Sequence, residues 1–190
     1  SKIRFSVLIS IFLELCVTIV TVCAQTVPTG LNATLFSTYY QQRVSLFRTL
    51  PVQPNQVVFL GNSITDGAEW NELFNQHSGI LNRGISGDLT AGVLNRLDEV
   101  TNRHPSKIFL LIGTNDLARG VSADSVIKNI LLMATLVHKS TPNTKLYIQS
   151  IFPVNPYYKL FASHTENTKK ILMINQILKQ KAEKHYYTYI

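Results

Sequence analysis

The chain has 190 residues, of which 18 are Lys or Arg and 11 are Asp or Glu, and its formal net charge is +7. This length suits one domain, and no internal repeat or low-complexity linker divides it. The positive charge does not indicate nucleic-acid binding, because aromatic and basic residues do not interleave as a stacking groove requires. Both cysteines, Cys16 and Cys23, precede residue 25, which excludes disulfides and thiolate metal ligands from the rest of the chain.

The first 24 residues are typical of a secretory signal peptide. A basic start precedes an apolar run over residues 5–22, and small residues follow at the cleavage position. We expect a signal peptide over residues 1–24, a mature domain over residues 25–190, and a secreted or periplasmic protein without stable membrane insertion after cleavage. Glu14 interrupts the apolar run and argues against both a signal peptide and a membrane-spanning anchor. A retained anchor stays open because the run approaches the length of about 20 residues that crosses a bilayer, and Cys23 leaves lipid attachment open.

A leading helix and a first strand come next. The helix is indicated by apolar residues at helical spacing, namely Leu31, Leu35, Tyr39 and Phe47. The apolar run 56–60 predicts a strand, and Gly61-Asn62-Ser63-Ile64-Thr65 then turns into a helix. Such a turn faces the crevice where parallel sheets bind ligands, and glycine allows it without a Cβ clash. Ser63 is therefore a candidate nucleophile, although a serine in this kind of turn can also serve helix capping alone.

Two later strands end in similar polar turns. Residues 79–81 precede the turn 82–88, and the buried run 107–112 precedes Gly113-Thr114-Asn115-Asp116. Turns after parallel strands open on one edge of the sheet, so Ser63, Gly87 and Asn115 are expected to converge. Serine attack on an ester carbonyl creates an oxyanion. The backbone N–H groups of Ser63 and Gly87 and the side-chain amide of Asn115 are suitable donors to it.

The second half of the chain continues the alternation of strands and helices. Ser122 is a plausible N-cap for a helix with one apolar stripe, formed by Val126, Ile127, Ile130, Leu131, Ala134 and Val137. A fourth strand over 145–150 precedes a loop and a lysine-rich helix, whose apolar positions are Ile171, Ile174, Leu178 and Ala182. A fifth strand is expected over 186–190. Such alternation predicts an α/β protein with a parallel sheet covered by helices on both faces.

The three polar turns resemble, in order, the first three sequence blocks of the SGNH hydrolases, also called the GDSL esterase/lipase superfamily. The branch related to platelet-activating-factor acetylhydrolase and bacterial carbohydrate O-acetylesterases is the most similar. The resemblance implies a flavodoxin-like α/β/α fold with strand order 2-1-3-4-5. It also implies Ser63 as nucleophile, Gly87 and Asn115 as oxyanion donors, and no metal or cofactor. Asn62 stands where the family has Asp, at a position that supports the turn.

The fourth block of that family, Asp-x-x-His, does not occur in this chain. It supplies the general base and its orienting acid, so neither is present here. We expect the pair to be encoded after Ile190, and the fragment by itself to be nearly inactive. His164 is the one histidine whose loop is expected near the pocket. It is either an alternative base or an ordinary solvated residue.

The sequence thus predicts a serine esterase for small-molecule or carbohydrate esters, most plausibly short acyl esters such as acetyl groups on carbohydrate. Lysophospholipids or thioesters are alternative substrates, and a non-catalytic carbohydrate-binding relative is an alternative function. Asp66, Asp88 and Asp116 are expected to act as turn or helix-cap residues. The side chains of Trp70, Leu73 and Phe74 are expected to pack in the core, with a substrate wall as the alternative for Trp70.

Overall fold

The computed structural model describes residues 36–53, 55–74, 79–158 and 160–190. The predicted signal peptide and the start of the leading helix lie outside these ranges, so cleavage, anchoring, lipid attachment and secretion stay predictions. Within the described ranges, no helix combines the length and the apolar character that crossing a bilayer requires.

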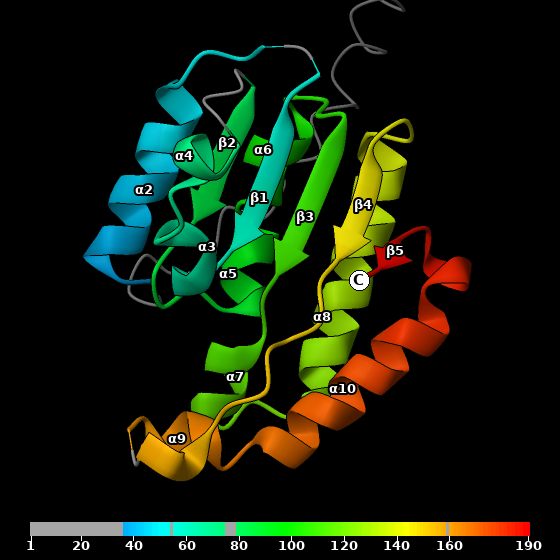
Figure 1. Cartoon of the computed structure of the whole chain (residues 1–190). Coiled ribbons are helices and arrows are strands. Elements are labelled where there is room, and N and C mark those ends of the chain that lie inside the picture. The colour runs from blue at the N-terminus through cyan, green and yellow to red at the C-terminus, as the bar shows by residue number, and fades with distance from the viewer. Residues whose placement is uncertain (1–35, 54, 75–78, 159) are drawn as a thin grey trace, which may run out of the picture. The chain divides into compact units, whose positions relative to one another are not determined.

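A parallel sheet forms the centre of the described chain (Figure 1). Its strand order, β2-β1-β3-β4-β5, confirms the predicted α/β class and the flavodoxin-like arrangement. All four strand pairs are parallel. The strands are β1 (Val57–Gly61), β2 (Ile80–Gly84), β3 (Lys107–Leu111), β4 (Lys145–Ile148) and the short β5 (Thr188–Tyr189).

Helices connect the strands, as the alternating sequence pattern predicts. Helix α2 (Thr38–Thr49) precedes β1, and between β1 and β3 lie α3 (Ser63–Asp66), α4 (Trp70–Leu73), α5 (Thr90–Asn95) and α6 (Leu97–Thr101). After β3 come α7 (Thr114–Ala118), α8 (Ala123–Ser140), α9 (Ala162–Thr165) and α10 (Thr168–Lys181). Short 3₁₀ turns lie at Pro156–Tyr158 and Glu183–His185.

One face of the sheet carries the main aliphatic core. Alternate strand residues such as Val58 and Ile108 are fully buried there, together with Ile130 of α8 and Ile174 of α10. Helix α8 begins as predicted, because the Ser122 hydroxyl accepts a hydrogen bond from the Ser125 N–H at 3.2 Å. Helices α5, α6 and α10 all contact α8. The predicted apolar stripes of α8 and α10 are therefore confirmed as core.

The opposite face is aromatic. Strand pairing places Phe59 beside Phe109, and their ring centroids lie 5.0 Å apart. Trp70 of α4 stacks on Phe59 at 3.7 Å, which confirms a packing role for this side chain. Phe74 also packs on this face, because its ring stacks on Phe59 at 5.7 Å although the residue is 39% exposed. The prediction is wrong for Leu73, which is 65% exposed. Helix α4 has a single turn, so it cannot direct all three side chains toward the sheet.

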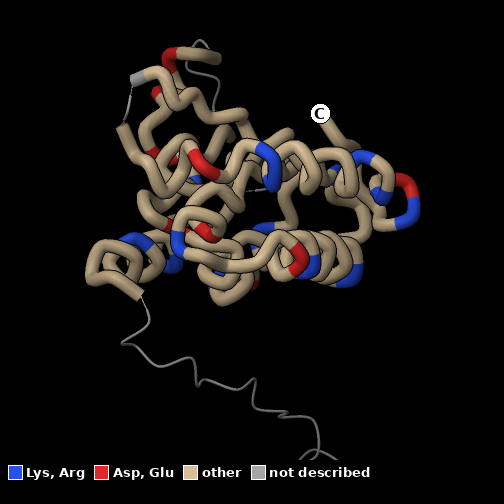
Figure 2. Tube along the Cα trace, turned by 90° about the horizontal axis from the view of Figure 1, so that it is seen from below, with Lys and Arg blue, Asp and Glu red and all other residues tan. Residues whose placement is uncertain are grey.

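Charged residues of both signs are distributed over the described trace (Figure 2). The lysines of α10 are exposed, whereas Ile171, Ile174 and Leu178 of the same helix are buried. This confirms that the lysines form the solvated face of an amphipathic helix.

Helices α3, α7 and α9 lie toward the carboxyl ends of the central strands (Figure 1). Helices α3 and α7 start directly after β1 and β3, and α9 contacts α7. The fold therefore gathers three short helices at the edge where parallel α/β sheets bind their ligands.

Candidate active site

Ser63 is the first residue of α3, immediately after β1. Asn62 is buried, and its side-chain oxygen accepts a hydrogen bond from the Ile64 N–H at 3.1 Å. This contact caps the helix and agrees with the predicted turn-supporting role of Asn62. Ser63 itself is exposed, and its N–H has no acceptor among the described residues. The serine thus presents a hydroxyl and an unused backbone donor on the surface of the turn.

Gly87 lies in the turn between β2 and α5, with φ at +81°, a conformation that favours glycine. Its carbonyl accepts a hydrogen bond from Arg119 at 3.2 Å. Its N–H has no acceptor in the described part of the chain. Gly87 therefore offers a second free backbone donor, in the place where the sequence predicts one.

Asn115 lies in the first turn of α7. Its side-chain nitrogen donates to the Asp88 carbonyl at 3.0 Å, which leaves one of its two amide hydrogens available. The neighbouring Asp116 is buried and accepts hydrogen bonds from the Thr90 N–H and hydroxyl. Burial raises the pKa of the Asp116 carboxyl above its ordinary value, while the Thr90 hydrogen bonds act in the opposite direction. As predicted, Asp116 caps a helix, here α5.

These residues line a single pocket of about 620 Å³. One side of it, the turn wall, is formed by Ser63, Ile64, Gly87, Thr114 and Asn115. The other side, the loop wall, comes from the segment between β4 and α10 and is formed by Val154, Asn155, Leu160, Phe161, His164 and Thr165. The structure therefore brings together the three site residues that the sequence predicts, although their catalytic roles stay predictions.

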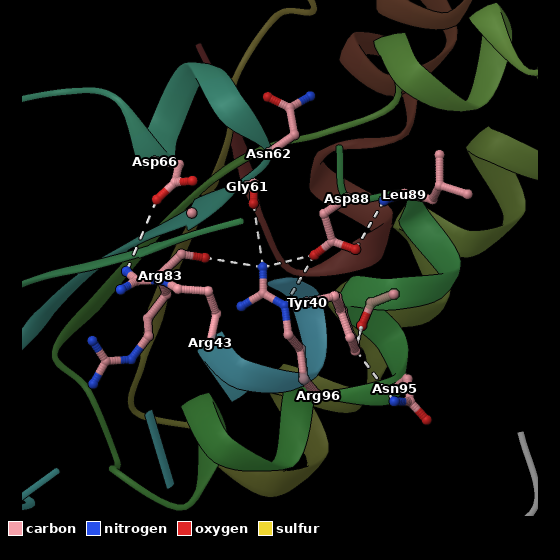
Figure 3. Close-up of polar contacts among 12 residues, drawn as sticks. Tyr40, Arg43, Gly61, Asn62, Asp66, Arg83, Asp88, Leu89, Asn95 and Arg96 are labelled. Carbon is pink, nitrogen blue, oxygen red and sulfur yellow. Dashed lines mark hydrogen bonds and ion pairs between the residues drawn. The ribbon is translucent and has the colours of Figure 1, made fainter. Parts of the chain in front are cut away.

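A buried arginine, Arg96, contacts chain segments next to the turn wall, namely Gly61, Arg83 and Asp88 (Figure 3). Arg96 is 1% exposed and pairs with the Asp88 carboxylate at 2.9 Å. The same guanidinium donates to the carbonyls of Gly61 at 3.2 Å and Arg83 at 3.0 Å. Burial raises the pKa of Asp88, and Arg96 opposes that rise. A single side chain thus connects the end of β1, the end of β2 and the turn that carries Gly87.

The prediction that Asp66 caps a helix is wrong, because its carboxylate contacts other elements instead. Its carboxylate accepts hydrogen bonds from the Ser86 N–H at 3.0 Å and from the Tyr39 hydroxyl at 2.8 Å. Arg43 pairs with it at 3.9 Å (Figure 3). Asp66 therefore connects α3 with the turn before Gly87 and with α2. Residue 84 is a glycine because the Asp66 backbone lies so close to it that a Cβ there would collide with it.

No described histidine or carboxylate hydrogen-bonds to the Ser63 hydroxyl. His164 lines the pocket, as its predicted loop position suggests, but its Nε2 lies 3.1 Å from the side-chain oxygen of Asn115. Within the described ranges, no group of three or more His, Cys, Asp or Glu residues could hold a metal ion.

Comparison with known proteins agrees with this geometry. Residues 59–190 match the GDSL-like Lipase/Acylhydrolase family. The chain belongs to this family. Its members are serine esterases and acylhydrolases, and the match includes Ser63, Gly87 and Asn115.

A curated relative matches part of the chain at low sequence identity. Platelet-activating factor acetylhydrolase IB subunit alpha1 of Bos taurus is 32% identical over 105 residues, which cover 52% of this chain and 44% of that protein. The chain thus spans less than half the length of this relative.

Two bacterial structures match over more of the chain. A protein from Streptococcus pneumonia, named for platelet activating factor, has a TM-score of 0.70 at 28% identity and covers 80% of this chain and 74% of its own. A GDSL-like lipase from Bacteroides thetaiotaomicron has a TM-score of 0.67 at 25% identity and covers 80% and 76%.

The sequence analysis did not identify Arg96 as a buried residue that connects the turns of the site. A usable signal was present, because Arg96 falls at helical spacing between Val93 and Val100, both of which are buried. A charged residue on an apolar stripe indicates a buried partner. The contact between His164 and Asn115 had no comparable signal, since it joins two short helices, α9 and α7, that are distant in sequence.

Proposed function

We propose that the protein is a serine hydrolase that cleaves carboxylic esters with Ser63 as its nucleophile. The observation that carries this proposal is the convergence of an exposed serine with three unused hydrogen-bond donors on one wall of a pocket. Family membership supports the same reaction class.

In this proposal the Ser63 oxygen attacks the ester carbonyl carbon, and the carbonyl oxygen becomes negatively charged. The N–H groups of Ser63 and Gly87 and the free amide hydrogen of Asn115 donate to that oxygen. The alcohol then leaves, and water hydrolyses the acyl-enzyme. A base must accept the serine proton. No described residue contacts the hydroxyl in that role, so the proposal requires a base from another part of the protein.

Two observations bear on the substrate class, namely the sequence resemblance and the lining of the pocket. Short acyl esters of carbohydrate remain the prediction from the sequence resemblance. The pocket supports the alternative of a more apolar ester or thioester, because Ile64, Val154, Leu160 and Phe161 line it with hydrocarbon.

The test uses protein expressed from the complete gene, with p-nitrophenyl esters as substrates and a fluorophosphonate probe for the nucleophile. Ser63→Ala is expected to abolish turnover and labelling, while Ser140→Ala, at the end of α8, is expected to retain both. Undiminished hydrolysis by Ser63→Ala would refute the assignment. Sugar binding without labelling of the unmodified protein would instead favour the non-catalytic alternative.

A further inference from the structure

His164 and Asn115 meet across the pocket although they come from different elements. Asn115 belongs to α7 and His164 to α9, and 3.1 Å separates the imidazole Nε2 from the amide oxygen Oδ1. The Phe161 ring lies edge-on to the imidazole, with 6.0 Å between the centroids. This contact connects the loop wall to the predicted oxyanion donor on the turn wall.

The hydrogen-bond partners determine which atom donates. The Asp88 carbonyl can only accept, so the Asn115 group facing it at 3.0 Å must be the NH₂. The amide oxygen therefore faces His164 and also only accepts. The imidazole must then carry a proton on Nε2 and donate it to Asn115. The Asn115 amide is consequently held at both ends, with one N–H left for the pocket.

The other imidazole nitrogen is not placed to act as a base. The Nδ1 atom of His164 is buried and has no hydrogen-bond partner among the described residues. A general base needs a free lone pair within reach of the serine hydroxyl. In His164 the nitrogen that meets Asn115 carries a proton, and the nitrogen with the lone pair is shielded from the pocket.

We infer that His164 is a positioning residue, whose Nε2–H holds the Asn115 amide with its free hydrogen directed at the oxyanion site. The inference rests on the proposed esterase function. It also gives the loop wall a second role, because the segment that lines the pocket also orients one of the donors.

The kinetic test compares His164→Leu, which removes the donor, with His164→Gln, whose amide nitrogen replaces Nε2. We expect His164→Leu to lower kcat about tenfold, as the loss of one hydrogen bond implies, with KM little changed. His164→Gln is expected to restore most of kcat. His138→Leu, at an exposed histidine of α8, serves as the control and is expected to match the unmodified protein.

A double-mutant cycle separates positioning from direct catalysis. Asn115→Ala is expected to lower kcat by about 10²- to 10³-fold, and adding His164→Leu to it should cause no further loss. Additive losses would overturn the inference. It would equally be overturned if both His164 variants lost as much activity as Ser63→Ala, or if His164→Leu had no effect.

A measurement without turnover keeps the inference testable if the proposed function fails. Nitrogen NMR of the chain should show His164 with its proton on Nε2 and a hydrogen bond to Asn115 that is lost in Asn115→Ala. A neutral ring protonated on Nδ1 would contradict the positioning role, whatever the kinetics show.

Discussion

The turn wall of the pocket is supported by buried ionic and hydrogen-bonded groups, whereas the loop wall includes large apolar side chains that are exposed. Arg96 next to the turn wall is 1% exposed, while Phe161 and Leu160 of the loop wall are 77% and 63% exposed. The predicted nucleophile and oxyanion donors all belong to the turn wall. We therefore expect the turn wall, together with His164, to supply the reaction geometry, and the exposed apolar side chains of the loop wall to supply contacts that vary with the substrate.

Replacing Arg96, which supports the turn wall, should cause the largest loss of stability. Arg96→Met leaves the Asp88 carboxylate buried without its partner, and removing one member of a buried pair costs about 3–5 kcal/mol of unfolding free energy. Chemical denaturation measures this change.

The matched control is Arg48→Met. Arg48 pairs with Asp98, and both side chains are more than half exposed, at 52% and 57%. Loss of such a surface pair is expected to cost about 0–1 kcal/mol. Equal losses in the two variants would show that the buried network does not hold the turn wall.

Changing the loop wall should alter selectivity and leave stability nearly intact. Phe161→Ala removes an exposed ring, so the unfolding free energy should change by less than about 0.5 kcal/mol. The kcat/KM ratio of hexanoyl to acetyl p-nitrophenyl ester is expected to fall about three- to tenfold, since apolar contact with the longer chain is lost.

Tyr157→Ala is the control for this change. Tyr157 belongs to the same segment and is 79% exposed, but it does not line the pocket. If both variants shifted the ratio equally, the loop wall would not be the selective surface.

The smallest expected effect concerns pH. Burial raises the pKa of Asp116 above its ordinary value of 3.8. Above pH 3.8 the unfolded chain has begun to release this proton while the folded protein still holds it. The contribution of Asp116 to stability therefore falls as pH rises from 3.8 through the raised pKa, and it is constant on either side of this window. Asp116→Asn should weaken the fall, as measured by denaturant unfolding at successive pH values.

Asp98→Asn, at the exposed pair with Arg48, is the control for the pH series. In this variant the unfolding free energy is expected to fall between pH 3.8 and the raised pKa of Asp116 by as much as it does in the unmodified protein. A pH profile of Asp116→Asn parallel to that of the unmodified protein would contradict the proposed effect of burial.

The sequence by itself determined the order of strands and helices, because periodicity and turn residues are local signals. Ser122 starts α8 and the stripe of α10 is buried as predicted, since capping and amphipathicity depend on nearby residues alone. The strand order came from the family resemblance. Ser63, Gly87 and Asn115 could be named because each ends a recognisable strand with a polar turn, and the carboxyl ends of parallel strands share one edge.

Only the tertiary structure decided how these turns are supported. The contacts of Arg96 with Gly61, of Asp66 with Ser86, and of His164 with Asn115 join residues 35, 20 and 49 positions apart. The misassigned burial of Leu73 has the same origin, because a short helix touches the sheet through whichever side chain its orientation allows. Such pairings depend on the packing of whole elements, and a local pattern carries no information about a partner that only folding brings near.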